Sequence, residues 1–189
     1  MKRGLNESEM TASSITLEQI INFLLEAPMF GDLDAMQLSQ IVHIMQVQRL
    51  RDGQIIFREG DPGDAWFVIY DGVADVYKSD DFLPSRRIAS LGNRACFGEM
   101  AILDHSPRSA SVVARGDATV FRFPRKDFEN LLREDNLAAY KLIYEMAKVL
   151  CVRARNTAQQ LTEALADQNE PDRLARTSMD LVLGQSVSE

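Results

Sequence analysis

Apolar residues recur at helical spacing in two short segments near the N-terminus. The first lies within 20–25, and the pair Thr16 and Gln19 just before it has the spacing of a capping box. Pro28 is expected to end this helix. A second helix is predicted to begin near Asp34. Its buried face is expected to consist of Leu38, Ile41, Val42 and Met45.

From residue 51 the pattern changes to short runs of β-branched and aromatic residues separated by Gly, Pro and Asp. The runs are 54–57, 66–70, 73–77, 87–91, 111–114 and 119–123. Asp71-Gly72 between two of them predicts a hairpin, because both turn residues tolerate positive φ. Only residues 99–103 interrupt the β pattern, as one expected helical turn. Many short, regularly spaced strands are typical of a sandwich, jelly roll or barrel.

After Pro124 the pattern becomes helical again. A short helix is predicted over 126–133 and a longer one over 136–167, and Glu170-Pro171-Asp172 is expected to end the regular structure. The predicted fold is thus mainly β with flanking helices: a jelly-roll-like β-barrel with two N-terminal helices and a long C-terminal helix. We expect residues 1–14 to be a mobile lead-in, 15–168 to form one domain, and 169–189 to be a polar tail.

The long helix carries a heptad stripe that is apolar or aromatic at seven of eight positions. An amphipathic helix that lies on its own barrel would show a similar pattern. We favour a mixture, in which the first half packs on the barrel and the second half pairs between subunits. The stripe consists of Tyr140, Ile143, Ala147, Leu150, Ala154, Thr157, Leu161 and Ala164.

Composition is that of a soluble globular protein, with 46% hydrophobic and 26% charged residues. The net charge of -7 argues against nucleic acid as the main partner, since phosphate neutralisation needs clustered Lys and Arg. No apolar run reaches membrane-spanning length, and the N-terminus does not resemble a secretory signal. Cys96 and Cys151 are too few for a disulfide framework. We therefore expect a cytoplasmic protein that does not associate with membranes.

The segment 97–112 combines groups that suit a sugar phosphate. Gly98 allows close backbone approach, and the N–H groups of Glu99, Met100 and Ala101 would begin a helical turn, where anions are favoured. Arg108 adds a permanently charged fork that matches phosphate oxygens. A carboxylate beside a phosphate makes sense if it faces a hydroxyl, and a ribose would supply one to Glu99.

This segment, FGEMAILDHSPRSASV, resembles the phosphate-binding cassette of the cyclic-nucleotide-binding domain family. That family includes catabolite-activator-type regulators, regulatory subunits of cyclic-AMP-dependent kinase and cyclic-nucleotide-gated channels. Its pattern is Phe-Gly-Glu, two or three apolar residues, a variable turn, and then Pro-Arg-Ala-Ala-Thr/Ser-Val. Upstream similarity lies in 53–61, 67–69 and 72–76. The resemblance covers roughly residues 20 to 155.

The resemblance implies a role for each matched position. Glu99 would accept a hydrogen bond from the ribose 2′-hydroxyl, and Arg108, helped by Ser109, would pair with the cyclic phosphate. Ile88 and Ala89 would contact the base, and Arg153 would approach its edge from the long helix. The expected ligand-binding set is Gly98, Glu99, Met100, Arg108, Ser109, Ala110, Ile88, Ala89 and Arg153.

Alternatives remain open at three of these positions. Arg108 would instead pair with Glu99 or Asp104 in a degenerate, ligand-free domain. The Ser109 hydroxyl suits either the 2-amino group of a syn guanine or the phosphate, so cAMP, which we favour, competes with cGMP. Arg153 suits a solvated helix surface equally well.

The sequence favours a binding module over an enzyme or a DNA-reading regulator. A cupin-like metalloenzyme needs clustered ligands, whereas His43 and His105 stand in unrelated places, so we expect neither a catalytic nor a metal site. No helix-turn-helix follows the long helix, so direct DNA binding is not expected. We expect a homodimeric cyclic-nucleotide receptor that needs no cofactor and signals to an unidentified protein effector. The alternatives are a nucleotide-insensitive interaction module and a transcription regulator without its own DNA-binding domain.

Overall fold

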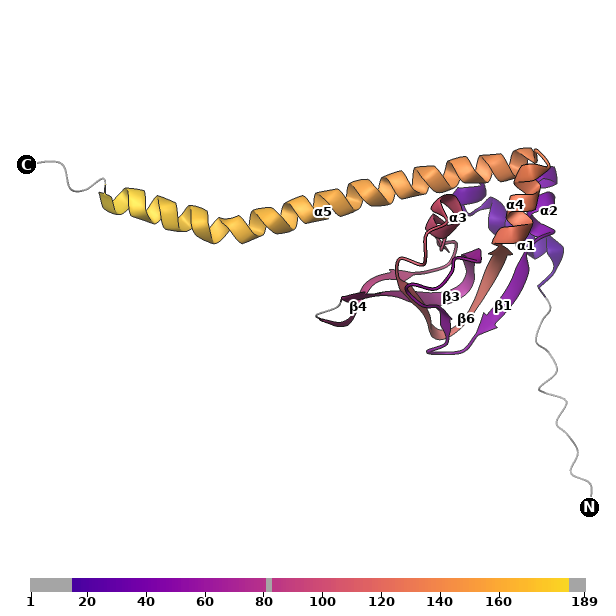
Figure 1. Ribbon diagram of the computed structural model, residues 1–189, viewed down its shortest axis with the longest axis horizontal. Coiled ribbons are helices and arrows are strands. Elements are labelled where there is room, and N and C mark those ends of the chain that lie inside the picture. The colour runs from indigo at the N-terminus through magenta and orange to yellow at the C-terminus, as the bar shows by residue number, and fades with distance from the viewer. Residues whose placement is uncertain (1–14, 81–82, 184–189) are drawn as a thin grey trace, which may run out of the picture. The chain divides into compact units, whose positions relative to one another are not determined.

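The computed structural model describes residues 15–80 and 83–183 (Figure 1). The chain forms two compact units, with the boundary between Met146 and Ala147. The expected lead-in 1–14 and the end of the expected tail, 184–189, lie outside the described residues.

Both predicted N-terminal helices are confirmed. Helix α1 (Leu17–Leu25) begins at a capping box made by Thr16 and Gln19, as the sequence predicted. Pro28 opens a short 3₁₀ turn, η2 (Pro28–Phe30), and helix α2 (Ala35–Val42) begins at a second capping box, on Asp34. Met45 was expected on the buried face of α2, but the helix ends before it.

Among the described residues, six antiparallel strands form one sheet in the order β1-β6-β3-β4, with β2 paired to β6 and β5 to β3. The predicted jelly-roll-like fold with flanking helices is therefore confirmed. In the part of the chain that the structure describes, the sheet is not closed, because β1 and β4 end the order. The strands are β1 (Gln46–Leu50), β2 (Ile55–Phe57), β3 (Ala65–Asp80), β4 (Leu83–Leu91), β5 (Cys96–Phe97) and β6 (Ser111–Pro124).

The hairpin predicted at Asp71-Gly72 is wrong, because β3 runs straight through it. Both halves of β3 pair with β6, with Asp71 opposite Thr119 and Val73 opposite Arg115. Gly72 therefore faces residues 116–118, an irregularity that the positive φ angles of Gly72 (93°) and Gly116 (73°) allow. The glycines bend two paired strands together and do not reverse the chain.

Aromatic rings fill the interior at the end of the sheet where the helices gather. Trp66 stacks on Phe123 with ring centroids 4.1 Å apart, and Phe30 and Phe128 lie against the same pair. Figure 1 shows α1, α2 and α4 (Arg125–Arg133) together beyond this end of the strands. Helix α4 follows β6 directly, so its start and the last residues of β6 are held by the same core.

Helix α5 (Leu137–Leu183) is longer than the sequence predicted. Pro171 was expected to end it, yet the helix continues to Leu183. In its first turns the buried residues are Ala138, Ala139, Leu142, Glu145 and Met146, whereas Tyr140 on the predicted stripe is 48% exposed. The face that packs on the domain is thus not the predicted heptad face. Within the described residues, no helix is both long and apolar enough to cross a membrane.

Helix α3 (Met100–Asp104) is the single turn that the sequence predicted, and it rests against Gly63. A Cβ atom at Gly63 would lie 2.2 Å from the Ala101 Cβ and 3.1 Å from an Arg125 guanidinium nitrogen. The absence of a side chain at Gly63 therefore sets how closely α3 approaches the turn before β3.

Replacing Gly63 with alanine should destabilise the domain by about 1–3 kcal/mol, the usual cost of overpacking. Denaturant unfolding would measure this change. Gly92→Ala is the matched control, because a Cβ there meets nothing within 4 Å. Equal stability of the two variants would contradict the proposed contact.

Candidate functional site

The segment 97–112 is a strand end, a helical turn and a loop that leads into β6. Gly98 has φ 78°, a left-handed conformation that turns the chain from β5 into α3. Two backbone hydrogen bonds then fix the loop: the Arg108 N–H donates to the Asp61 carbonyl, and the Gly60 N–H donates to the Arg108 carbonyl, both at 2.9 Å. The turn at 58–61 thus holds the backbone of Arg108 in place.

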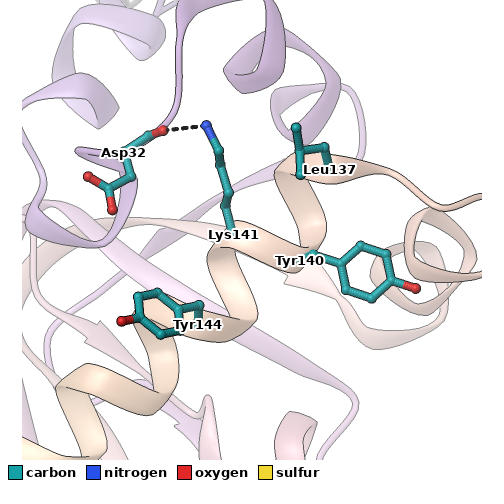
Figure 2. Close-up of a pocket in the computed structure, with 5 residues that line it drawn as sticks. All are labelled: Asp32, Leu137, Tyr140, Lys141 and Tyr144. Carbon is teal, nitrogen blue, oxygen red and sulfur yellow. Dashed lines mark hydrogen bonds between the residues drawn. The ribbon is translucent and has the colours of Figure 1, made fainter.

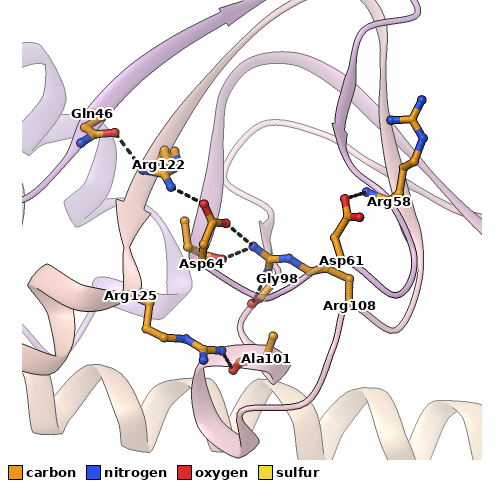
Figure 3. A network of polar contacts seen from close by, with 10 residues as sticks. Gln46, Arg58, Asp61, Asp64, Gly98, Ala101, Arg108, Arg122 and Arg125 are labelled. Carbon is orange, nitrogen blue, oxygen red and sulfur yellow. Dashed lines mark hydrogen bonds and ion pairs between the residues drawn. The ribbon is translucent and has the colours of Figure 1, made fainter.

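The Arg108 side chain is folded inward and is only 1% exposed (Figure 3). One terminal nitrogen donates to the Gly98 carbonyl at 3.0 Å, and the other donates to the Ala65 carbonyl at 2.6 Å and to Asp64 Oδ1 at 3.3 Å. The guanidinium carbon lies 4.1 Å from the centroid of the Phe57 ring. A Cβ at Gly98 would lie 2.7 Å from the Arg108 guanidinium, so glycine leaves the room that this side chain occupies.

The buried charge of Arg108 is incompletely compensated. Burial lowers the pKa of its guanidinium, Asp64 opposes this, and the nearby Arg125 and Arg122 lower it further. The Asp64 side chain is 66% exposed, so water weakens its attraction for Arg108. In addition, the buried Arg108 Nε has no hydrogen-bond acceptor among the described residues. A bound anion would supply both the missing charge and the missing acceptor.

Arg108 forms an ion pair with Asp64, a residue that the sequence placed only in a turn between strands. The sequence predicts Glu99 or Asp104 as the partner in a ligand-free domain, and the structure shows an ion pair with Asp64 at 3.3 Å. Asp104 Oδ1 instead accepts a hydrogen bond from the Ser106 N–H at 2.9 Å. Glu99 is 1% exposed and begins α3, beside Gly98. Glu99 and Arg108 are thus both buried, and Arg108 reaches the carbonyl of Gly98, the residue before Glu99.

Lys78 holds the exposed side of the loop. Its Nζ donates to the Ser109 carbonyl at 2.7 Å and forms an ion pair with Glu59. The Ser109 hydroxyl is exposed and lies 3.8 Å from the Met100 sulfur, so these two predicted residues are neighbours. Sequence reasoning missed Lys78 and Glu59, and nothing in their spacing in the sequence would have indicated them.

The predicted base-contacting residues lie on β4. Val112 at the end of the segment, Val76 on β3 and Ala89 on β4 stand in register across three strands. Adjacent strands are about 4.8 Å apart, so Ala89 lies roughly 10 Å from Val112. Ile88 is 59% exposed, which leaves it free to contact a ligand.

Asp75 fixes this part of β4. It is 4% exposed, accepts a hydrogen bond from the Ser90 hydroxyl, and pairs with Arg87 at 3.3 Å and Arg115 at 3.8 Å. The bond from Ser90 is the largest cause that holds the pKa of Asp75 below its ordinary value, and both arginines act in the same direction against burial. Since Arg87 and Ser90 flank the two predicted base contacts, Asp75 holds those contacts in register.

Two other features lie apart from this arrangement. Arg153 belongs to the second compact unit, so its contact with the base stays a prediction. An open groove of about 530 Å³ lies where α5 begins, lined by Asp32, Leu137, Tyr140, Lys141 and Tyr144 (Figure 2). None of these residues belongs to the segment 97–112.

Comparison with known proteins agrees with this geometry. The model of the cyclic nucleotide-binding domain matches residues 47–135. Over this segment the chain is similar to the cyclic nucleotide-binding domain family. The matched segment includes β3, β4, Arg108 and β6.

Among curated proteins, the chain is similar to the cAMP-dependent protein kinase regulatory subunit of Aspergillus niger. The two are 36% identical over 110 residues, which is 58% of this chain and 26% of that protein. The chain thus spans about a quarter of this curated relative.

Two solved structures share the fold at 26% identity. One is a cyclic nucleotide-binding domain from Methylobacillus flagellatus KT, with a TM-score of 0.71 over 77% of this chain and 84% of that one. The other is the catabolite activator protein of Thermus thermophilus, with a TM-score of 0.66 over 84% of this chain and 72% of that one.

Asp75 should stabilise the domain in a pH-dependent way. Folding lowers the pKa of Asp75. Its carboxylate therefore stabilises the folded state above the unfolded-state pKa of about 3.9, and this stabilisation is lost as pH falls through the folded-state pKa. Wild type should therefore exceed Asp75→Asn in unfolding free energy at pH 7, and the gap should narrow towards pH 3.

Urea titrations at the two pH values would measure this gap. Asp117→Asn, at the exposed bend of β6, serves as the control. A gap for Asp75→Asn that stays constant between pH 7 and pH 3 would refute the assignment.

Proposed function

We propose that this protein is a cyclic-nucleotide receptor in which Arg108 binds the cyclic phosphate and Glu99 binds the ribose. The observation that carries the proposal is the buried Arg108 guanidinium, whose Nε has no acceptor among the described residues and whose paired carboxylate is mostly exposed. A cyclic phosphate carries one negative charge and two exocyclic oxygens, so it fits this fork and offers it an acceptor.

The other predicted residues fit the same ligand. The buried carboxylate of Glu99 is suited to accept from a ribose hydroxyl, and Gly98 places the backbone beside the sugar-phosphate. The exposed Ile88 and Ala89 offer an apolar surface to a purine. Ser109, exposed next to Met100, would assist the phosphate.

We favour cAMP over cGMP as the ligand. Several similar curated proteins are named cAMP-dependent protein kinase regulatory subunits, although another, from Bradyrhizobium diazoefficiens, is named Glutaminase 1. Ser109 lies next to Arg108 in the same loop. Its hydroxyl is therefore suited to donate a hydrogen bond to the phosphate, an interaction that cAMP offers as well as cGMP.

Calorimetric titration would test both statements. Wild type should bind cAMP more tightly than cGMP. Arg108→Ala should weaken cAMP binding by at least about tenfold, since a charge-assisted hydrogen bond contributes about 1.5–3 kcal/mol. Arg108→Lys keeps the positive charge but loses the planar guanidinium, so its affinity for cAMP should lie between those of wild type and Arg108→Ala.

Arg133→Ala is the control, since Arg133 is exposed and pairs with Glu129 on α4. Thermal melts would establish that each variant is folded. Failure of wild type to bind either nucleotide would disprove the proposal.

A receptor signals only if nucleotide binding changes its interaction with another molecule. We propose that the protein is cytoplasmic, forms a homodimer through the second half of α5, and transmits nucleotide binding to a separate effector protein. In support, the heptad residue Leu161 is 60% exposed on this helix, and a second copy would cover it. To convert the receptor from almost entirely one conformation to almost entirely another, the nucleotide must bind the second conformation more tightly by about 5.5 kcal/mol.

Leu161→Asp should convert a dimer to a monomer in sedimentation experiments. Burying one leucine contributes about 1.5–3 kcal/mol, so two symmetry-related changes would weaken the dimer at least about 100-fold. Val152→Asp is the matched control, because Val152 is 51% exposed and lies off the heptad stripe. A wild type that sediments as a monomer would argue against the dimer.

A further inference from the structure

The carboxylate beside Arg108 is shared with a second arginine. Asp64 Oδ1 accepts from Arg108 at 3.3 Å, while Asp64 Oδ2 accepts from Arg122 at 2.6 Å (Figure 3). The bond to Arg122 is the shorter of the two. Asp64 therefore divides its charge between two arginines, and the larger share goes to Arg122.

Arg122 is well placed to hold Asp64 in this position. Its side chain is only 24% exposed, and its other terminal nitrogen donates to Gln46 Oε1 at 2.9 Å. Gln46 is the register partner of Arg122 across β1 and β6. The backbone of Asp64 is fixed from the same strand end, because the Arg125 N–H donates to the Asp64 carbonyl at 2.7 Å.

We infer that Arg122 is a positioning residue that keeps Arg108 available to an anionic ligand by drawing the Asp64 carboxylate away from it. Without Arg122, Asp64 would turn its full charge to Arg108 and compete with the phosphate. A second positive charge near the site would also be lost. Both effects weaken anion binding, although Arg122 itself need not touch the ligand.

This inference rests on the proposed function and is distinct from the role of Arg108. Arg122→Gln should weaken cAMP binding by about three- to tenfold, the coupling expected for neighbouring charged groups. Arg122→Lys should restore most of the affinity, since lysine keeps a charge within reach of Asp64. A residue that served only to stabilise the fold would show no such dependence on charge.

A double-mutant cycle isolates the route through Asp64. In an Asp64→Asn background, Arg122→Gln should change cAMP affinity by less than about half its effect in wild type, because the shared carboxylate is gone. Arg133→Gln controls for the loss of a positive charge outside the site. Thermal melts of all variants separate loss of fold from loss of binding.

Three outcomes would overturn the inference while wild type still binds cAMP. These are unchanged affinity in Arg122→Gln, an equal loss in Arg122→Lys, and a full effect of Arg122→Gln in the Asp64→Asn background. Absence of cAMP and cGMP binding by wild type would instead overturn the proposed function and this inference with it. The two failures are therefore distinguishable in one set of titrations.

Discussion

A buried guanidinium is the constraint around which this domain is organised. Removing a charge from water costs several kcal/mol unless partners replace the lost hydration. Here the Arg108 guanidinium contacts two backbone carbonyls, the rings of Phe57 and Phe67, and one carboxylate that it shares with Arg122. These partners come from β2, from the start of β3 and the residue before it, and from the residue after β5, so these segments must be assembled before the charge can be accommodated.

The sheet provides this assembly through two long strands. Because β3 and β6 stay paired on both sides of their glycine bends, the Ala65 end of β3 and the Ser111 end of β6 belong to one ladder. The first supplies a carbonyl to Arg108, and the second begins just after its loop. A hairpin at Gly72 would have separated the two halves of β3, and the register that aligns Ala89 with Val112 would have been lost.

The sequence predicted those features whose determinants are local. The capping box of α1, the start of α2 near Asp34 and the turn of α3 depend on residues within four positions of each other, so spacing alone was sufficient. Strand β1 was missed because its side chains are mostly polar and exposed, and only pairing with β6 makes it a strand. Asp64 was missed as the partner of Arg108 because 44 positions separate the two residues. Long-range pairing is decided by topology, which short motifs do not encode.

The contact between Gly63 and α3 also limits how this sequence could diverge. Only one methyl group fits between positions 63 and 101, and Ala101 already supplies it. A chain that acquires alanine at 63 would therefore need glycine at 101 to keep the same backbone separation. In related sequences that keep this geometry, the two positions should vary as a pair, with the methyl on one side or the other.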